Sequence, residues 1–148
     1  DTKSIQSHRG GCQCGAVRYQ VEGAPLVVAH CHCQACQRAS GAGHSTGAMF
    51  QDDTFRLTGR VAEFKYDSDN QNQVTRVFCP VCGSPLYGHN SGTTGFVTLT
   101  LGSIDDSSGF VPQVTIFTRN CKAWDKVDES IEAFEAQPDW KPGNNGGI

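Results

Sequence analysis

Phe78-Cys79-Pro80-Val81-Cys82-Gly83, near the middle of the chain, is a Cys-x-x-Cys pair followed by a glycine. In such a knuckle the backbone folds back so that its amides face the sulfurs, and the glycine can take the positive φ that the turn needs. Thiols two or three positions apart are poorly placed to form a disulfide with each other, but they can direct two sulfurs at one tetrahedral metal ion. Three such clusters contain seven of the eight cysteines and predict metal ligands: Cys12 and Cys14; Cys31, Cys33 and Cys36; Cys79 and Cys82.

The seven clustered thiols divide into a set of four and a set of three. A structural zinc site is closed by four protein ligands, whereas a catalytic site keeps three and leaves one position for water or substrate. We expect a closed zinc site formed by Cys12, Cys14, Cys79 and Cys82, and an open zinc site formed by Cys31, Cys33 and Cys36, because this partition uses all seven thiols. The competing partition is a four-cysteine ribbon of Cys33, Cys36, Cys79 and Cys82, which leaves Cys12, Cys14 and Cys31 for other roles.

Disulfide bonds are the alternative use of the cysteines, since eight thiols in a secreted chain could form up to four bridges. A chain of 148 residues does not need such staples, because at this length roughly 68–70% of the unfolded surface is buried by folding alone. The segment Asp1-Thr2-Lys3-Ser4-Ile5-Gln6 is polar, and no apolar run approaches the ~20 residues that cross a bilayer. We therefore expect a reducing, cytoplasmic setting and no membrane partner.

Composition favours one soluble domain, with 37% hydrophobic and 18% charged residues. The net charge of -3 offers no general attraction for phosphates, so nucleic acid is not expected as a partner. The basic residues in the middle of the chain alternate with acidic ones, and we interpret both as the polar faces of strands: Arg56, Arg60, Lys65 and Arg76 among Asp52, Asp53, Glu63 and Asp67.

The pattern of short segments and turn residues, with 17 glycines, predicts a mainly β fold with few short helices. Period-two alternation or short apolar runs predict strands at 16–21, 26–30, 45–50, 54–57, 61–66, 73–78, 96–101 and 111–118. Helical turns are expected at 34–39, ended by Ser40-Gly41, and at 129–136 before Pro138. We expect a single zinc-binding domain over residues 1–137 and a loose tail over 138–148.

Three segments together resemble the glutathione-dependent formaldehyde-activating enzyme family. They are 11–19 (Gly-Cys-Gln-Cys-Gly-Ala-Val-Arg-Tyr), 30–41 (His-Cys-His-Cys-Gln-Ala-Cys-Gln-Arg-Ala-Ser-Gly) and 78–87 (Phe-Cys-Pro-Val-Cys-Gly-Ser-Pro-Leu-Tyr), and a weaker match near Gly102 to Trp124 extends the likeness to about residue 135. The resemblance implies an Mss4-like zinc-stabilised β-sheet fold. It also implies that Cys12, Cys14, Cys79 and Cys82 hold a structural zinc, and that Cys31, Cys33 and Cys36 hold a labile, catalytic one.

The activity implied by the resemblance is the formation of S-hydroxymethylglutathione from glutathione and formaldehyde, or its reversal as a carbon–sulfur lyase. The bare residues are consistent with it, because a thiol that binds a metal loses its proton more readily. The alternative is a zinc-stabilised binding module or a carrier of glutathione or another thiol. The enzyme would lose turnover and its second zinc on Cys33→Ala, whereas the binding module would have no labile zinc.

Other residues near these segments have less defined roles. His30 and His32 flank the cysteines and could hydrogen-bond to sulfur or move a proton, or serve as ordinary strand residues. His44 and Arg38 are candidates for binding a glutathione carboxylate, and Trp124 for packing or substrate contact. Cys121 is expected to be a free thiol. Thr115, Cys121 and the residue before Trp124 depart from the family pattern, which leaves the zinc ligands intact but leaves the thiol and the aldehyde open.

Overall fold

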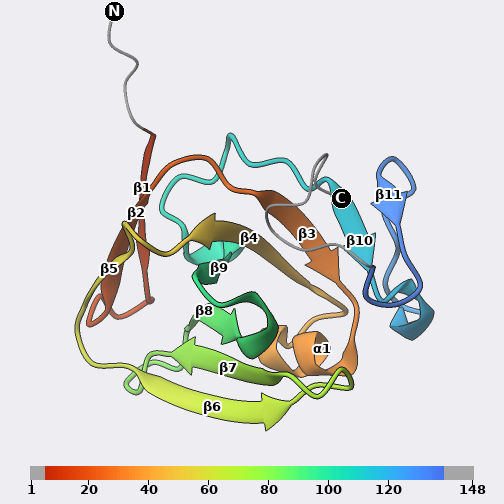
Figure 1. The fold of residues 1–148 in the computed structure, drawn as a ribbon, viewed down its shortest axis with the longest axis horizontal. Coiled ribbons are helices and arrows are strands. Elements are labelled where there is room, and N and C mark those ends of the chain that lie inside the picture. Colours follow the sequence, from red (N-terminus) through yellow and green to blue (C-terminus); the bar gives the residue numbers. More distant parts are fainter. Residues whose placement is uncertain (1–5, 139–148) are drawn as a thin grey trace, which may run out of the picture.

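The fold is a mainly β structure of two sheets with one short α-helix, seen in a computed structural model that describes residues 6–138 (Figure 1). The strands are β1 Ser7–Gly11, β2 Arg18–Glu22, β3 Val27–Cys31, β4 Ser45–Gln51, β5 Arg56–Thr58, β6 Ala62–Asp67, β7 Gln73–Phe78, β8 Pro85–Asn90, β9 Phe96–Thr100, β10 Val114–Ile116 and β11 Glu132–Ala133. The helix is α1 Gln34–Ser40, and three 3-10 turns are η1 Ser91–Thr93, η2 Leu101–Ser103 and η3 Thr118–Asn120.

The strands form a small sheet in the order β1-β2-β5 and a large one in the order β11-β10-β3-β4-β9-β8-β7-β6. Pairing is antiparallel throughout the small sheet and along the large sheet from β3 to β6. The exceptions are β10, which runs parallel to β3, and β11, which runs parallel to β10. These two pairs bring the segment after residue 110 beside the end of β3, where the Cys31 group lies.

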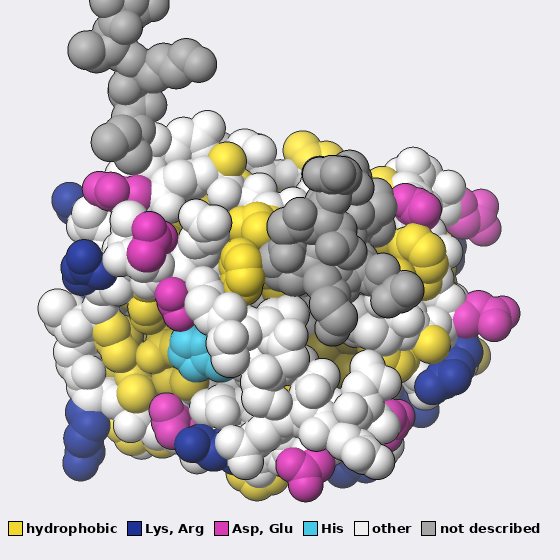
Figure 2. Space-filling model, viewed as in Figure 1, with side chains coloured by type: hydrophobic (Ala, Val, Ile, Leu, Met, Phe, Trp, Pro, Cys, Tyr) yellow, Lys and Arg dark blue, Asp and Glu magenta, His cyan; other side chains and the backbone are white. Residues whose placement is uncertain are grey.

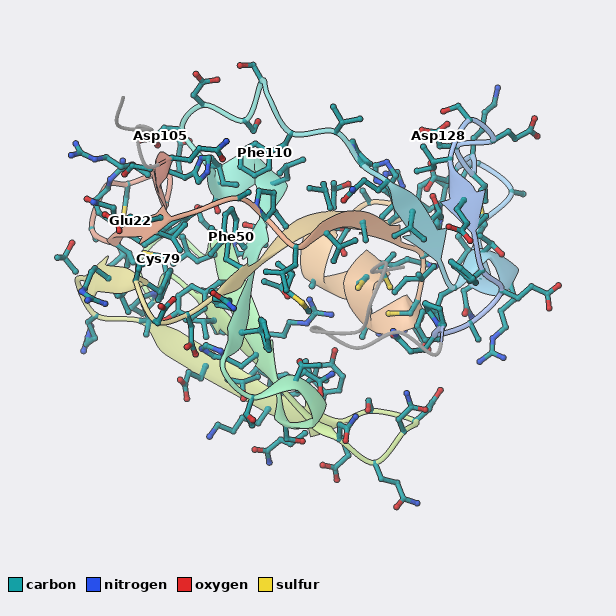
Figure 3. All side chains as sticks on the ribbon, turned by 45° about the horizontal axis from the view of Figure 1, so that its top comes forward. Glu22, Phe50, Cys79, Asp105, Phe110 and Asp128 are labelled. Carbon is teal, nitrogen blue, oxygen red and sulfur yellow. The ribbon has the colours of Figure 1, made fainter. Side chains whose placement is uncertain are left out.

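The core lies between the sheets and follows from alternation along the strands. Tyr19 and Val21 of β2 are buried, as are Ala48 and Phe50 of β4 and Val97 and Leu99 of β9. On neighbouring strands the buried residues are direct partners, because Ala48 pairs with Leu99 and Phe50 with Val97. Buried Phe50 also contacts the partly buried Phe110 in an edge-on arrangement with ring centroids 6.2 Å apart, and Figure 3 labels both residues.

Helix α1 begins directly after β3 because Cys33 caps it. The Cys33 backbone is extended, and its sulfur accepts a hydrogen bond from the Cys36 amide at 3.4 Å, as a serine or aspartate oxygen does at other helix starts. The helix ends at Gly41, which has φ of +72° and donates its N–H to the Gln37 carbonyl. One helical turn therefore holds two of the clustered cysteines in a fixed relation.

The predicted mainly β fold is confirmed, and most predicted strands are present with shifted ends. The structure adds β1 and β8, which the sequence pattern did not indicate. β1 contains Ser7-His8-Arg9-Gly10-Gly11 and has no apolar alternation, while β8 contains a proline and a glycine. β10 is shorter than the strand predicted over 111–118.

The helix predicted at 129–136 is wrong, because the segment there contains the short strand β11. Val114 pairs with Glu132 and Thr115 with Ala133, and the Phe134 amide donates to the Thr115 carbonyl at 2.9 Å. β10 would otherwise leave these backbone groups unpaired at the edge of the large sheet. Tertiary pairing therefore overrides a weak helical pattern. The loose tail predicted over 138–148 falls, from residue 139 onward, outside the described residues.

The described surface carries no concentrated basic area on the face drawn in Figure 2, where lysine and arginine side chains are interspersed with acidic ones. Arg56, Arg60 and Lys65 are exposed, as their interpretation as polar strand faces predicts. That interpretation is wrong for Arg76, which is half-buried and donates hydrogen bonds to Cys36 and Tyr66. Within residues 6–138, no helix has the length and apolar character that crossing a membrane requires.

Candidate metal centres

The four-cysteine cluster, Cys12, Cys14, Cys79 and Cys82, joins the turn between β1 and β2 to the turn between β7 and β8. Its four sulfurs lie within 4.8 Å of one another. The Cys14 sulfur is 3.6 Å from that of Cys12 and 3.7 Å from that of Cys79. Zinc–sulfur bonds of about 2.3 Å in a tetrahedron place neighbouring sulfurs roughly 3.8 Å apart, so the spacing fits a zinc ion.

Backbone amides surround these sulfurs. Cys79 accepts from the amides of Val81 at 3.3 Å and Cys82 at 3.4 Å, and Cys12 accepts from the Val17 amide at 3.2 Å. Gly83 has φ of +78° and donates to the Cys79 carbonyl at 2.9 Å, which closes the knuckle. Amides that point at sulfur stabilise the thiolate form, which is the form that binds metal.

Ser84 connects the two halves of the four-cysteine cluster. Its hydroxyl accepts from the Gln13 amide at 3.0 Å and lies 3.2 Å from the Cys82 sulfur. Hydrogen bonds from the Ser84 hydroxyl and backbone lower the pKa of the Cys82 thiol to about 5. The cluster thus has an arrangement suited to anionic sulfurs, although Cys14 and Cys82 are exposed.

The three-cysteine cluster consists of Cys31 at the end of β3, Cys33 at the start of α1 and Cys36 in its first turn. The three sulfurs lie within 4.8 Å of one another. Cys31 is held between β4 and β10, because it pairs with Ser45 on one side and with Ile116 on the other. Strand and helix therefore each contribute ligands that their backbones fix in place.

Arg76 of β7 lies beside this cluster and was not predicted as a site residue. Its Nη2 donates to the Cys36 sulfur at 3.3 Å and to the Tyr66 hydroxyl at 3.1 Å. Hydrogen bonds from the Cys31 and Cys33 thiols, together with the Arg76 charge, lower the pKa of Cys36, whereas the contacts with Cys33 and Cys36 raise the pKa of Cys31. Without a cation, one thiolate is therefore favoured and a second is disfavoured.

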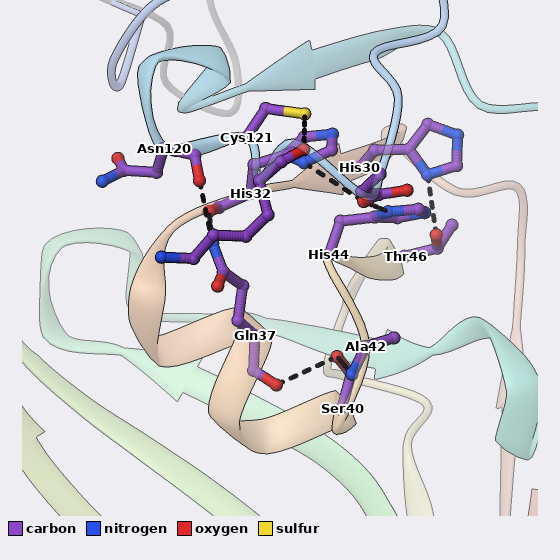
Figure 4. Close-up of polar contacts among 11 residues, drawn as sticks. His30, His32, Gln37, Ser40, Ala42, His44, Thr46, Asn120 and Cys121 are labelled. Atoms are coloured by element: carbon purple, nitrogen blue, oxygen red, sulfur yellow. Dashed lines mark hydrogen bonds and ion pairs between the residues drawn. The ribbon is translucent and has the colours of Figure 1, made fainter.

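A third group of ligating side chains lies nearby: His32, His44 and Asp125. The His44 Nδ1 is 2.7 Å from the Asp125 Oδ2, and the His32 Nδ1 is 3.5 Å from the same oxygen. Figure 4 shows His32 and His44 converging beneath the segment that contains Asn120 and Cys121. Hydrogen bonding from His44 lowers the pKa of Asp125, while burial, with His44 as a second cause, lowers the pKa of His32.

The other residues singled out from the sequence have simpler surroundings. His30 donates to or accepts from the Thr46 hydroxyl at 2.7 Å, and Trp124 is 72% exposed. Cys121 is a free thiol whose sulfur lies 3.6 Å from the Lys122 carbonyl, outside both clusters. Arg38 is in the last turn of α1.

The structure brings the seven thiols together as one group of four and one group of three, and that these groups bind metal stays a prediction. Sequence reasoning missed Arg76, Tyr66 and Asp125. The one sequence feature that could have indicated Arg76 is that it is a charged residue within a predicted strand. Asp125 was missed because it lies 81 residues from His44 in the chain.

Comparison with known proteins agrees on one family. The family described as "Glutathione-dependent formaldehyde-activating enzyme" matches residues 7–120. A Halomonas elongata protein described as "Putative glutathione-dependent formaldehyde-activating enzyme" is 26% identical in an alignment 138 residues long, which covers 88% of this chain and 88% of that protein. The crystal structure of a Rhodobacter sphaeroides protein is similar with a TM-score of 0.54 and 19% identity, over 70% of this chain and 97% of the other, which supports the fold.

Proposed function

The chain belongs to the glutathione-dependent formaldehyde-activating enzyme family, and from this premise we propose that it is a zinc-dependent carbon–sulfur lyase that forms and cleaves S-hydroxymethylglutathione. The observation that carries the proposal is that three thiols, Cys31, Cys33 and Cys36, converge apart from a complete set of four. Three protein ligands are typical of a catalytic zinc site and four of a structural one.

The donor sets fit zinc in both places. Cys12, Cys14, Cys79 and Cys82 would hold the structural ion, and Cys31, Cys33 and Cys36 the second. At the second site zinc would be held by three thiolates, which would leave a position where a bound thiol loses its proton more readily. Three anionic sulfurs would make the zinc ion a weak Lewis acid. We therefore infer that it would bind and deprotonate the thiol substrate rather than polarise the aldehyde.

The proposed reaction is an addition that needs no oxidant or reductant. The sulfur of glutathione bonds to the carbonyl carbon of formaldehyde, the thiol proton is lost, and the carbonyl oxygen gains a proton. The reverse reaction breaks the carbon–sulfur bond and returns both substrates. Arg76 supports the site from outside: its guanidinium holds negative charge on Cys36, and Tyr66 orients the guanidinium by accepting a second hydrogen bond.

A reducing compartment suits this assignment, because the eight cysteines are free in the structure and seven of them belong to the two clusters. We therefore place the enzyme in the cytoplasm, with glutathione or a related thiol and a small aldehyde as its partners.

Exchange NMR tests the proposal directly. Zinc-loaded enzyme should accelerate the exchange between free glutathione and its formaldehyde adduct, relative to the same mixture without enzyme. Cys33→Ser should abolish the acceleration. Native mass spectrometry should then count one zinc ion in this variant instead of two. A serine oxygen can still cap α1, so the fold should persist. Unchanged exchange in a folded variant that has lost one zinc would refute the proposal, and glutathione binding without acceleration by the wild type would identify a thiol carrier instead.

A further inference from the structure

The group His32, His44 and Asp125 is separate from both cysteine clusters and is not used by the proposed reaction. One ring nitrogen from each histidine and one carboxylate oxygen lie within 4.8 Å of one another. The three residues come from three segments: His32 follows β3, His44 precedes β4, and Asp125 lies in the turn after η3. Two imidazoles and one carboxylate are ligands that suit first-row divalent transition metals.

The His32 ring supplies an independent sign of a missing ligand. Its side chain is 1% exposed, and among the described residues its Nδ1 has no hydrogen-bond partner. The Asp125 carboxylate faces this nitrogen, and its Oδ2 is 3.5 Å away. A buried nitrogen with no partner is costly, and one that faces a carboxylate without bonding to it leaves room for a cation between the two.

The spacing of the three ligand atoms is close to what a metal ion requires. Bonds of about 2.0–2.1 Å to nitrogen and oxygen place neighbouring ligand atoms of a tetrahedron roughly 3.3 Å apart. The His32–Asp125 separation of 3.5 Å is close to this value, and the His44–Asp125 contact of 2.7 Å would have to lengthen by about half an ångström. Without a metal ion, the hydrogen bond between His44 and Asp125 holds the carboxylate in position.

The surroundings give the group both close packing and access. A Cβ built on Gly43 would overlap the Asp125 carboxylate, so glycine at this position lets the carboxylate approach His44 and His32. The side chains of His44 and Asp125 are 31% and 19% exposed, which opens the group to solvent on one side. An ion could therefore enter past His44 and reach the buried nitrogen of His32.

We propose that His32, His44 and Asp125 form a third metal site, which binds one first-row divalent transition metal ion through two imidazole nitrogens and one carboxylate oxygen. Three protein ligands leave positions for water or a small oxygen ligand. With one anionic ligand in place of three, this site would keep a net positive charge on the ion, unlike the three-cysteine cluster.

Cobalt titration of protein whose two cysteine clusters are already filled with zinc tests the site. We expect one further equivalent of Co²⁺ with weak d–d absorption and without the intense sulfur-to-cobalt charge-transfer bands of thiolate sites. Asp125→Asn and His44→Gln should each raise the Kd for this ion about tenfold or more. His89→Gln removes a histidine of β8 and serves as the matched control, which should bind cobalt as the wild type does.

The thiolate zinc count of each variant, measured by native mass spectrometry, reports whether it is folded. Uptake of no further cobalt by the wild type would overturn the proposal, as would uptake that persists unchanged in folded Asp125→Asn and His44→Gln. Charge-transfer bands on the added equivalent would overturn it as well, because they would mean that cobalt had replaced zinc on sulfur. The outcome does not depend on turnover, so this site and the proposed lyase activity can fail separately.

Discussion

The four-cysteine and three-cysteine clusters use the same ligand chemistry in opposite settings. In the first, Cys12 and Cys79 accept hydrogen bonds from backbone amides, and the ligands come from two chain turns that are far apart in the sequence. In the second, Cys36 accepts from the Arg76 guanidinium, and all ligands come from six consecutive residues. Backbone donors persist in every substitution except one to proline, whereas the arginine donor is lost when Arg76 is replaced. We infer that the four-cysteine cluster stabilises the fold, whereas the charge beside the three-cysteine cluster depends on the Arg76 side chain.

The largest effect is expected from Cys79→Ser. Cys79 is fully buried, accepts two amide hydrogen bonds and joins β7 to the hairpin of β1 and β2. Structural zinc contributes roughly 10–16 kcal/mol to folding in zinc-finger peptides, so loss of one ligand should forfeit a large part of the stability. Thermal unfolding followed by circular dichroism should show loss of the cooperative transition or a strongly lowered Tm.

Cys121→Ser is the control for that change, since Cys121 is a thiol outside both clusters. It should keep two zinc ions and the Tm of the wild type. A Cys79→Ser protein that melts like the Cys121→Ser protein would show that the four-cysteine cluster does not secure the fold.

The second prediction separates the two roles of Cys33 in the three-cysteine cluster. Cys33→Ser and Cys33→Ala should both lose turnover and one zinc, since each removes a thiolate. The alanine variant also loses the cap of α1 and should be less stable than the serine variant by about 1 kcal/mol. Urea denaturation compares the two directly, and equal stabilities would mean that the sulfur cap contributes nothing measurable.

The third prediction concerns Arg76. Arg76→Gln removes the cation beside Cys36, so zinc at the three-cysteine cluster should bind about 10- to 100-fold more weakly, as measured by competition with a chelator. Zinc at the four-cysteine cluster should be unaffected. Arg18→Gln is the control, because Arg18 pairs with Asp105 at the surface. Equal weakening at both clusters would indicate general destabilisation and contradict a local role.

Much of the fold and the grouping of the thiols could be predicted from the sequence, because strand alternation and ligand spacing are local properties. Val17 to Val21 and Val97 to Leu99 show their buried face by period alone. β11 was not predictable, because it is defined by its pairing with β10, which lies 18 residues earlier in the chain. The same holds for the contacts of Arg76 and Asp125, which join side chains 40 and 81 residues apart. No pattern within a short window contains such contacts.

The smallest effect is expected from Tyr66→Phe, which tests whether the orientation of the Arg76 guanidinium matters at the three-cysteine cluster. This change leaves every thiol and the Arg76 charge in place and removes only the hydroxyl that accepts from Arg76 at 3.1 Å. A net hydrogen bond is worth about 1 kcal/mol, so zinc affinity at the three-cysteine cluster should fall roughly fivefold. If affinity falls while the four-cysteine cluster is unchanged, then the orientation of the guanidinium matters as well as its charge. If affinity is unchanged, the charge of Arg76 suffices and Tyr66 only fills space, which a double variant with Arg76→Gln would show as simple additivity.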